Sequence, residues 1–174
     1  MKEKTKHFLE KNIIFFVLFL GIGLGFLIAN TFVFSDCRAD FRMYPENDDE
    51  IIYLIDSANE KIYVEMYVFS NEEIRDAIIR ASDRGIDVRI ILEKSIAQNT
   101  ETYNNLKSNG VDVRWSGGYS LNHAKLVIID KLVILGSPNF SWSAFHKNRE
   151  HAVLLKCDTH PLEKEFLKDW LLSG

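Results

Sequence analysis

Residues 123–139 read H-A-K-L-V-I-I-D-K-L-V-I-L-G-S-P-N, two apolar runs with one charged pair between them. The runs are Leu126–Ile129 and Leu132–Leu135, and their aliphatic, β-branched composition predicts two strands. The pair Asp130-Lys131 has the right length for a two-residue hairpin turn. We therefore expect a hairpin here, around which the rest of the chain is organised.

Reactive and polar side chains lie at the open end of this predicted hairpin. Side chains alternate between the two faces of a strand, so His123 and Lys125 project to the same side if the segment is extended. Ser137 and Asn139 have the same spacing after the second strand. A nucleophilic imidazole, a cation and two small polar groups would thus be presented together. Such a set predicts a cradle for a phosphate group.

The chain before the hairpin alternates between predicted strands and predicted helices. Runs of β-branched residues predict strands, and apolar residues at helical spacing predict helices. The predicted strands cover residues 62–70, 87–92 and 111–115, and the predicted helices cover residues 48–58, 70–84 and 100–108. Ser70 followed by Glu73 is a capping-box pattern, which predicts where the second helix begins.

Two further elements are expected after the hairpin, a strand over residues 152–156 and a terminal amphipathic helix over residues 161–172. The earlier alternation of strands and helices implies right-handed crossovers between parallel strands. We therefore expect an α/β fold with a mixed, mostly parallel sheet flanked by helices on both faces. Ligand sites in such sheets gather at the carboxyl ends of the strands.

Residues 13–34 contain no charged side chain and are almost wholly apolar. As a helix this segment is long enough to cross a hydrocarbon core of about 30 Å. The apolar core is longer than that of a cleaved secretory signal, and no clean A-x-A site follows it. An uncleaved signal anchor is therefore favoured over a cleaved signal and over a buried core helix.

Flanking cations predict the orientation of this segment. Four lysines precede it, between residues 2 and 11, whereas Arg38 and Arg42 follow it among acidic residues. We expect a single-pass membrane protein with a cytoplasmic N-terminus and an extracytoplasmic domain. The expected parts are a tail (1–12), a transmembrane anchor (13–34), a linker (35–47) and a globular domain (48–174).

Composition limits the classes of function. The chain is 47% hydrophobic and 26% charged, which is typical of a globular protein. Its net charge is −4, and the part after residue 34 has 17 Lys and Arg against 23 Asp and Glu. This balance argues against a strongly basic nucleic-acid-binding protein.

The two cysteines, Cys37 and Cys157, lie 120 positions apart, with no second Cys at zinc spacing beside either. This pattern predicts neither a disulfide framework nor a structural zinc site. We expect unpaired thiols. An interchain bridge through Cys37 is the alternative if that residue faces an oxidising compartment.

The polar residues around the hairpin resemble the pattern of the phospholipase D superfamily, H-x-K-x-x-x-x-D followed by G-S-x-N. The matching positions are His123, Lys125, Asp130, Gly136, Ser137 and Asn139. The resemblance covers about residues 42–172 and implies the phospholipase D and nuclease-like fold. The pattern occurs once, as in the small single-motif endonucleases and a membrane-anchored mitochondrial relative, which pair two chains to make one active site.

The chain departs from the superfamily pattern in two ways. Members often carry N-x-E-N after the G-S-x-N, whereas Asn148-Arg149-Glu150 is followed here by His151. This keeps the glutamate and replaces the final asparagine. The mitochondrial relative has a zinc-binding insertion whose cysteines are missing here, so the likeness to that branch is architectural.

The resemblance implies phosphodiester cleavage that needs neither a metal nor a cofactor. His123 of one chain would attack phosphorus to give a phosphohistidine, and His123 of a second chain would protonate the leaving oxygen. Lys125 and Asn139 would hold the non-bridging oxygens as charge develops. Lys147 is a further candidate for substrate binding, in a basic groove with Lys125 and Arg149.

Three other residues complete the candidate site. Ser137 and Glu150 are expected to orient the histidines. Asp130 belongs to the matched pattern, but its place at the hairpin turn favours a structural role over direct contact with phosphate.

Three substrate hypotheses follow. The first is a homodimeric nuclease that cuts DNA or RNA, as the single-motif resemblance implies. The second is a phospholipase D that acts on headgroups of the membrane in which residues 13–34 are anchored. The third is a non-catalytic, membrane-anchored module that binds phosphate groups, against which the complete set of His123, Lys125 and Asn139 argues. We rank the nuclease slightly above the phospholipase and both above the module.

Overall fold

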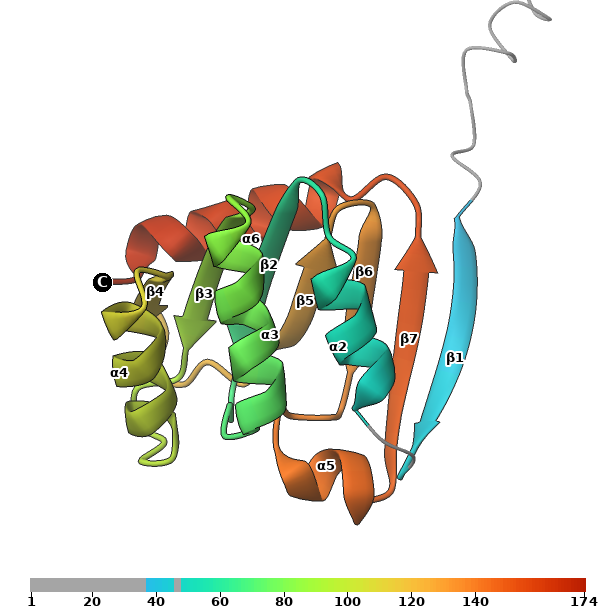
Figure 1. Cartoon of the computed structure of the whole chain (residues 1–174), viewed down its shortest axis with the longest axis horizontal. Coiled ribbons are helices and arrows are strands. Elements are labelled where there is room, and N and C mark those ends of the chain that lie inside the picture. The colour runs from blue at the N-terminus through green and yellow to red at the C-terminus, as the bar shows by residue number, and fades with distance from the viewer. Residues whose placement is uncertain (1–36, 46–47) are drawn as a thin grey trace, which may run out of the picture. The chain divides into compact units, whose positions relative to one another are not determined.

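The computed structural model describes residues 37–45 and 48–174 (Figure 1). The predicted tail and transmembrane anchor, residues 1–34, lie outside this range. Within the described residues, no helix combines the length and the apolar composition that crossing a membrane requires.

In the described part of the chain, seven strands form one sheet in the order β1-β7-β6-β5-β2-β3-β4. The strands are β1 (Arg38–Tyr44), β2 (Lys61–Met66), β3 (Asp87–Leu92), β4 (Asp112–Trp115), β5 (Lys125–Ile129), β6 (Leu132–Gly136) and β7 (Glu150–Lys156). The predicted hairpin is therefore present as β5 and β6, and it lies in the middle of the sheet.

The sheet is mixed, but the prediction that it is mostly parallel is wrong. Strands β2, β3 and β4 pair in parallel. The pairs β2–β5, β5–β6, β6–β7 and β7–β1 are antiparallel. Helical crossovers connect β2 to β3 and β3 to β4, which allows these three strands to run in parallel. By contrast, β5 turns directly into β6, which forces these two strands to run in opposite directions. Apolar runs predict that a segment is a strand and leave its direction open.

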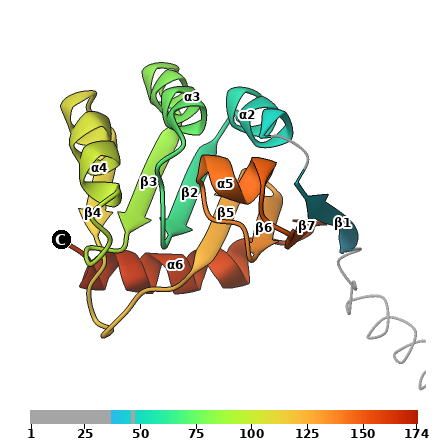
Figure 2. The ribbon, with the colours of Figure 1, turned by 90° about the horizontal axis from the view of Figure 1, so that it is seen from below.

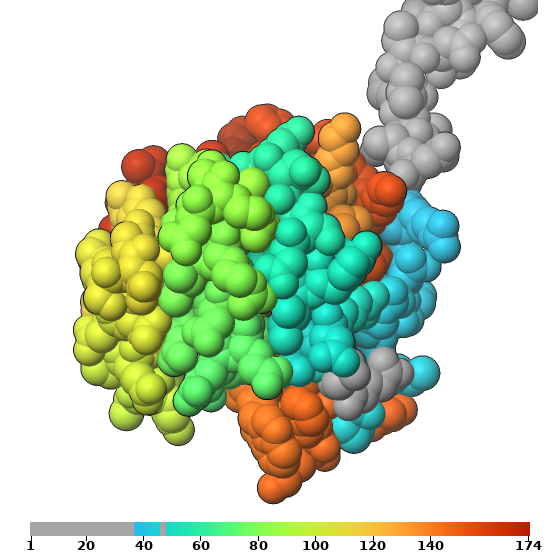
Figure 3. All heavy atoms as spheres, in the orientation of Figure 1, coloured from blue at the N-terminus to red at the C-terminus, as the bar shows by residue number. Residues whose placement is uncertain are grey.

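Helices cover both faces of the sheet, as predicted (Figure 2). The helices are α2 (Asp49–Asp56), α3 (Glu72–Asp83), α4 (Asn99–Ser108), α5 (Trp142–His146) and α6 (His160–Leu172). Helices α2, α3 and α4 lie side by side over one face (Figure 3), and α6 crosses the other. The core has a corresponding cluster on each side, one around Ile55, Ile78 and Ile90 and one around Ile128 and Phe166.

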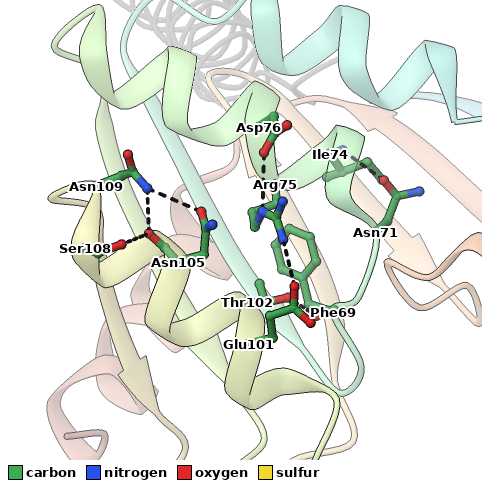
Figure 4. Close-up of polar contacts among 10 residues, drawn as sticks. All are labelled: Phe69, Asn71, Ile74, Arg75, Asp76, Glu101, Thr102, Asn105, Ser108 and Asn109. Carbon is green, nitrogen blue, oxygen red and sulfur yellow. Dashed lines mark hydrogen bonds and ion pairs between the residues drawn. The ribbon is translucent and has the colours of Figure 1, made fainter.

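Helix α3 begins at Glu72, and the predicted capping box at Ser70 and Glu73 is wrong. Asn71 is the N-cap: its backbone is extended, and its Oδ1 accepts a hydrogen bond from the Ile74 N–H at 2.9 Å (Figure 4). The Ser70 N–H instead donates to the carbonyl of Phe140 at 2.8 Å. This bond joins the segment after β2 to the loop after β6, where the candidate site lies.

The expected linker contains an additional edge strand, β1. It pairs with β7 along its whole length, from Arg38 opposite Lys156 to Tyr44 opposite Glu150. Tyr44 is buried, whereas Phe41 is 76% exposed. The linker prediction overlooked the alternation of charged and apolar residues in this strand, which is a strand pattern. Most of its apolar side chains are exposed, so backbone pairing rather than apolar burial holds it.

Candidate active site

The ends of several strands meet at one edge of the sheet and bring several of the predicted residues together. Lys125 begins β5 and lies opposite Met66, which ends the antiparallel strand β2. His123 precedes Lys125 by two residues. On the neighbouring strands, Gly136 ends β6 and Glu150 begins β7.

His123 and Lys125 contact each other, as strand alternation predicted. Lys125 Nζ lies 3.3 Å from His123 Nδ1 and 3.4 Å from Nε2, and it donates a hydrogen bond to the His123 carbonyl at 2.9 Å. The Tyr67 ring packs against both, with its centroid 4.3 Å from that of the imidazole and 4.9 Å from Nζ. Burial lowers the pKa of Lys125, and the carboxylate of Glu150 opposes this shift. The imidazole itself is exposed to solvent.

Ser137 and Glu150 are also brought together. The Ser137 hydroxyl donates to the Glu150 carboxylate and accepts from the His151 N–H at 3.2 Å. The Asn148 side chain donates to the same carboxylate at 3.1 Å. A Cβ at Gly136 would lie 2.4 Å from the His151 carbonyl oxygen, so only glycine allows β6 to approach β7 closely here. These contacts fix the Glu150 carboxylate beside the site.

Asn139 is half-buried, and its side-chain oxygen is already used. Oδ1 accepts a hydrogen bond from the Val68 N–H at 3.2 Å, and the Asn139 carbonyl accepts from the Ser141 N–H at 2.9 Å. Within residues 37–45 and 48–174, its Nδ2 has no hydrogen-bond partner. The amide is therefore oriented with its two N–H donors available for a ligand.

Two buried glutamates hold the residue that precedes His123, and the sequence did not single them out. Asn122 donates from its backbone N–H to Glu93 Oε2 at 2.8 Å and from its side chain to Glu65. Its own Oδ1 accepts from the Ala124 N–H at 3.0 Å. The loop that carries His123 is thus fixed on both sides of the imidazole. The sequence did contain a signal for these glutamates, because Glu65 lies within an apolar strand and Glu93 directly follows one.

The two glutamates differ in their electrostatics. Burial alone would raise the pKa of Glu93, but hydrogen bonds from Ser95, Asn122 and Ser116 outweigh it and lower the pKa to about 2. Burial raises the pKa of Glu65, and the hydrogen bond from Asn122 only partly offsets this. Glu93 is therefore the acceptor of the pair that is charged at neutral pH.

Asp130 lies at the opposite end of β5 from His123 and Lys125. It has a positive φ of 51°, and its carboxylate accepts hydrogen bonds from the N–H groups of Asn59, Glu60 and Lys61 at 2.9, 2.9 and 3.0 Å. These bonds join the hairpin turn to the start of β2. These contacts give Asp130 a structural role at the turn and leave its carboxylate away from His123 and Lys125.

Replacement of Asp130 by asparagine should destabilise the protein without moving the site. Asparagine tolerates the positive φ, so the variant removes mainly the charge. We expect a loss of about 1–3 kcal/mol in the free energy of unfolding at neutral pH, measured by urea titration. Asp112→Asn is the control, because Asp112 is exposed on the edge strand β4.

The effect of Asp130→Asn should depend on pH. Burial would raise the pKa of Asp130, but the three backbone N–H groups outweigh it and lower the pKa. The stabilisation is therefore present above the unfolded pKa of about 3.9 and is lost as the pH falls through the lower folded value. A difference between wild type and variant that stays constant down to about pH 2 would contradict this role.

Lys147 lies outside the His123 and Lys125 cluster, directly after α5. Its Nζ is 4.8 Å from the centroid of the Trp142 ring, and that ring stacks on His146 with a centroid distance of 5.0 Å. Trp142 is 55% exposed. These three side chains form an exposed surface, here called the α5 platform, which follows Asn139 closely in the chain.

Comparisons with known proteins show an enzyme that cleaves phosphodiesters. A sequence model described as cardiolipin synthase, PLD-like domain, matches residues 51–170. The chain belongs to this family within the phospholipase D superfamily, and it is a phosphodiester hydrolase.

Individual relatives agree with this assignment. The phospholipase D of Rickettsia prowazekii is 29% identical, and the match covers 98% of this chain and 94% of that relative. Among solved structures, Nuc, a phospholipase D family member from Salmonella typhimurium, aligns with a TM-score of 0.73 at 24% identity, over 80% of this chain and 97% of Nuc. NucT from Helicobacter pylori aligns with a TM-score of 0.69 at 25% identity, over 79% of this chain and 98% of NucT.

Proposed function

We propose that the protein hydrolyses phosphodiester bonds of nucleic acid through a phosphohistidine on His123, without a metal, in a site that two copies share. One observation carries this proposal. The ammonium of Lys125 lies within 3.4 Å of both imidazole nitrogens of His123, on an exposed edge of the sheet. A phosphate bound by Lys125 would therefore sit within reach of the imidazole.

Each group has a defined part in the proposed reaction. The neutral imidazole of His123 attacks phosphorus, the bond to the leaving oxygen breaks, and the protonated His123 of the second copy donates a proton to that oxygen. The same second imidazole then takes a proton from water, which displaces the first histidine from phosphorus. Lys125 and the Nδ2 group of Asn139 stabilise the negative charge on the non-bridging oxygens.

The second copy is needed because one imidazole cannot be nucleophile and acid for the same phosphate. The H-x-K pattern occurs once in the chain. Ser137 and Glu150 support the strand ends around the cluster and are proposed to orient the histidines in the pair. The exposed position of His123 leaves room for a second copy to face it.

The α5 platform favours nucleic acid as the substrate. Trp142 is exposed, and Lys147 lies against its ring. Aromatic side chains beside cations are suited to stacking on bases while the phosphates are neutralised. Because the net charge of the chain is −4, the attraction of nucleic acid would come from cations at the site rather than from the electrostatic field of the whole protein.

A phospholipid is the second candidate substrate. The relative from Rickettsia prowazekii is a phospholipase D, and residues 13–34 have the composition of a membrane anchor. We propose that this segment places the domain outside the cytoplasm, where protease added to intact cells would cleave it. An anchored enzyme would meet headgroups at high local concentration.

Chelation tests the metal-free mechanism. The full chain, purified in detergent, should hydrolyse bis(p-nitrophenyl) phosphate at the same rate with and without excess EDTA, because lysine rather than a metal neutralises the phosphate. Loss of activity in EDTA that added Mg²⁺ or Zn²⁺ restores would refute the mechanism.

A substrate panel tests the choice of substrate. Single-stranded DNA, duplex DNA, RNA and phosphatidylcholine vesicles are compared at equal phosphodiester concentration. Trp142→Ala should reduce cleavage of nucleic acid more than cleavage of the small diester, because the small diester has no bases to stack on the Trp142 ring. If the protein hydrolyses only the phosphatidylcholine vesicles, the proposed nuclease function is wrong and the phospholipase function takes its place.

A further inference from the structure

The two cysteines, distant in sequence, lie opposite each other at one end of the β1–β7 ladder. The register pairs Arg38 with Lys156 in antiparallel strands, so one residue beyond this pair places Cys37 opposite Cys157. Opposite residues in such a ladder have Cα atoms about 4.5 or 5.5 Å apart. A disulfide bond spans about 4.4–6.8 Å between Cα atoms. The backbone is thus already in place for a bond between them.

The thiols of the two cysteines are also neighbours. The two thiols lie close enough to interact, and this interaction with Cys37, together with burial, raises the pKa of Cys157. Both thiols are free, with Cys37 exposed and Cys157 half-buried. A thiol-reactive compound from solvent therefore reaches Cys37 first, and the Cys157 thiol lies beside it.

We propose that Cys37 and Cys157 form an intrachain disulfide bond, made by exchange with an oxidising disulfide compound. The Cys37 thiolate attacks a sulfur of that compound, and one of its two thiols leaves. The Cys157 thiolate then displaces the second thiol from the mixed disulfide. The chain loses two protons and two electrons, and the oxidant is reduced to two thiols. The extracytoplasmic location proposed above would supply such oxidants.

The bond would fasten the weaker end of an edge strand. Side-chain contacts hold the carboxyl half of β1: Arg42 binds Glu50 with two hydrogen bonds of 2.7 Å, and the Tyr44 ring packs against Phe145 at 5.1 Å. At the amino end, Arg38 is exposed, and its ion pair, with Asp40, stays within the strand. Strand β1 would therefore open from its amino end.

This end also connects to the apolar segment 13–34. Any pull between the membrane and the domain would act first on the start of β1. The ladder would separate pair by pair from that point, toward Glu150 at the candidate site. A covalent bond at the first pair would stop this opening before it begins.

The thiol state of the full-length chain in detergent tests the proposal, independently of any enzymatic activity. The chain is incubated with glutathione disulfide or with dithiothreitol, alkylated, digested and examined by mass spectrometry. We expect a peptide pair joined through Cys37 and Cys157 in the oxidised sample, and a monomeric band on a non-reducing gel. Two alkylated cysteines after oxidation, or a disulfide-linked dimer, would overturn the proposal.

Thermal unfolding provides a second readout with matched controls. Because the bond closes a loop of about 120 residues, the oxidised chain should unfold about 5–15 °C above the reduced chain. Cys37→Ser and Cys157→Ser should each abolish this difference while unfolding at the temperature of the reduced wild type. An equal melting temperature for the oxidised and reduced wild type would show that the bond does not fasten β1.

Discussion

Replacement of His123 by asparagine is expected to lower the rate of bis(p-nitrophenyl) phosphate hydrolysis by about 10³-fold or more. Asparagine is similar in size and polar, but its amide can neither attack phosphorus nor carry a proton near neutral pH. In a shared site the substitution removes both the nucleophile and the acid. Since Lys125 and Asn139 remain, KM should change much less than kcat.

Two histidine variants serve as controls for His123→Asn. His160 is exposed at the start of α6, so His160→Asn should keep the rate within about twofold. His151 is exposed next to Glu150, and His151→Asn places asparagine where superfamily members often carry it. This second variant should remain active. A His123→Asn protein with the melting temperature and the full rate of the wild type would refute the assignment of the nucleophile.

The hairpin and its reactive end could be predicted because the information is local. Strands β5 and β6 are short apolar runs joined by two residues, and alternation alone places His123 beside Lys125. The same alternation does not bring Asp130 to that cluster, because β5 separates the two ends. The H-x-K-x-x-x-x-D pattern therefore combines two residues of the proposed reaction, His123 and Lys125, with Asp130, which stabilises the fold.

The remainder depended on contacts between distant residues. Strand direction depends on how the chain returns to the sheet, which apolar runs do not encode. The support of His123 by Glu93 required a contact between residues 29 positions apart. The juxtaposition of the cysteines depended on β1, a strand with little apolar burial. In each case the residue or strand could be read from the sequence, but the distant residue or strand that it contacts could not.

Replacement of Glu93 by glutamine is expected to weaken both folding and catalysis. Glu93 is 2% exposed, and its carboxylate accepts from the Ser95 N–H at 2.9 Å, the Ser116 hydroxyl at 2.8 Å and the Asn122 N–H at 2.8 Å. Glutamine would present an NH₂ group to some of these donors. We expect the free energy of unfolding to fall by about 2–3 kcal/mol at neutral pH, measured by urea titration. Glu101→Gln is the control, because Glu101 is exposed and its ion pair is long, at 3.9 Å.

The pH dependence of this loss identifies its cause. The pKa of Glu93 is lowered to about 2 in the folded protein, against about 4.3 in an unfolded chain. Its stabilisation is therefore complete above the unfolded value and disappears as the pH falls through the folded value. The difference between wild type and Glu93→Gln should be constant from about pH 7 to pH 5 and should close toward pH 2. A difference that does not change with pH would assign the loss to packing instead of charge.

The catalytic effect of the same variant tests whether Asn122 transmits the support to His123. With Glu93 uncharged, the backbone of Asn122 loses its charged acceptor, and the imidazole one residue later is held less firmly. A displacement of about 1 Å at a reacting group can cost up to about 100-fold in rate, so kcat should fall about 10-fold while KM stays nearly constant. Under conditions where the variant is fully folded, an unchanged kcat would show that Glu93 stabilises the fold without positioning the nucleophile. A similar loss of kcat in Asn122→Ala would show that Glu93 and Asn122 act together to position His123.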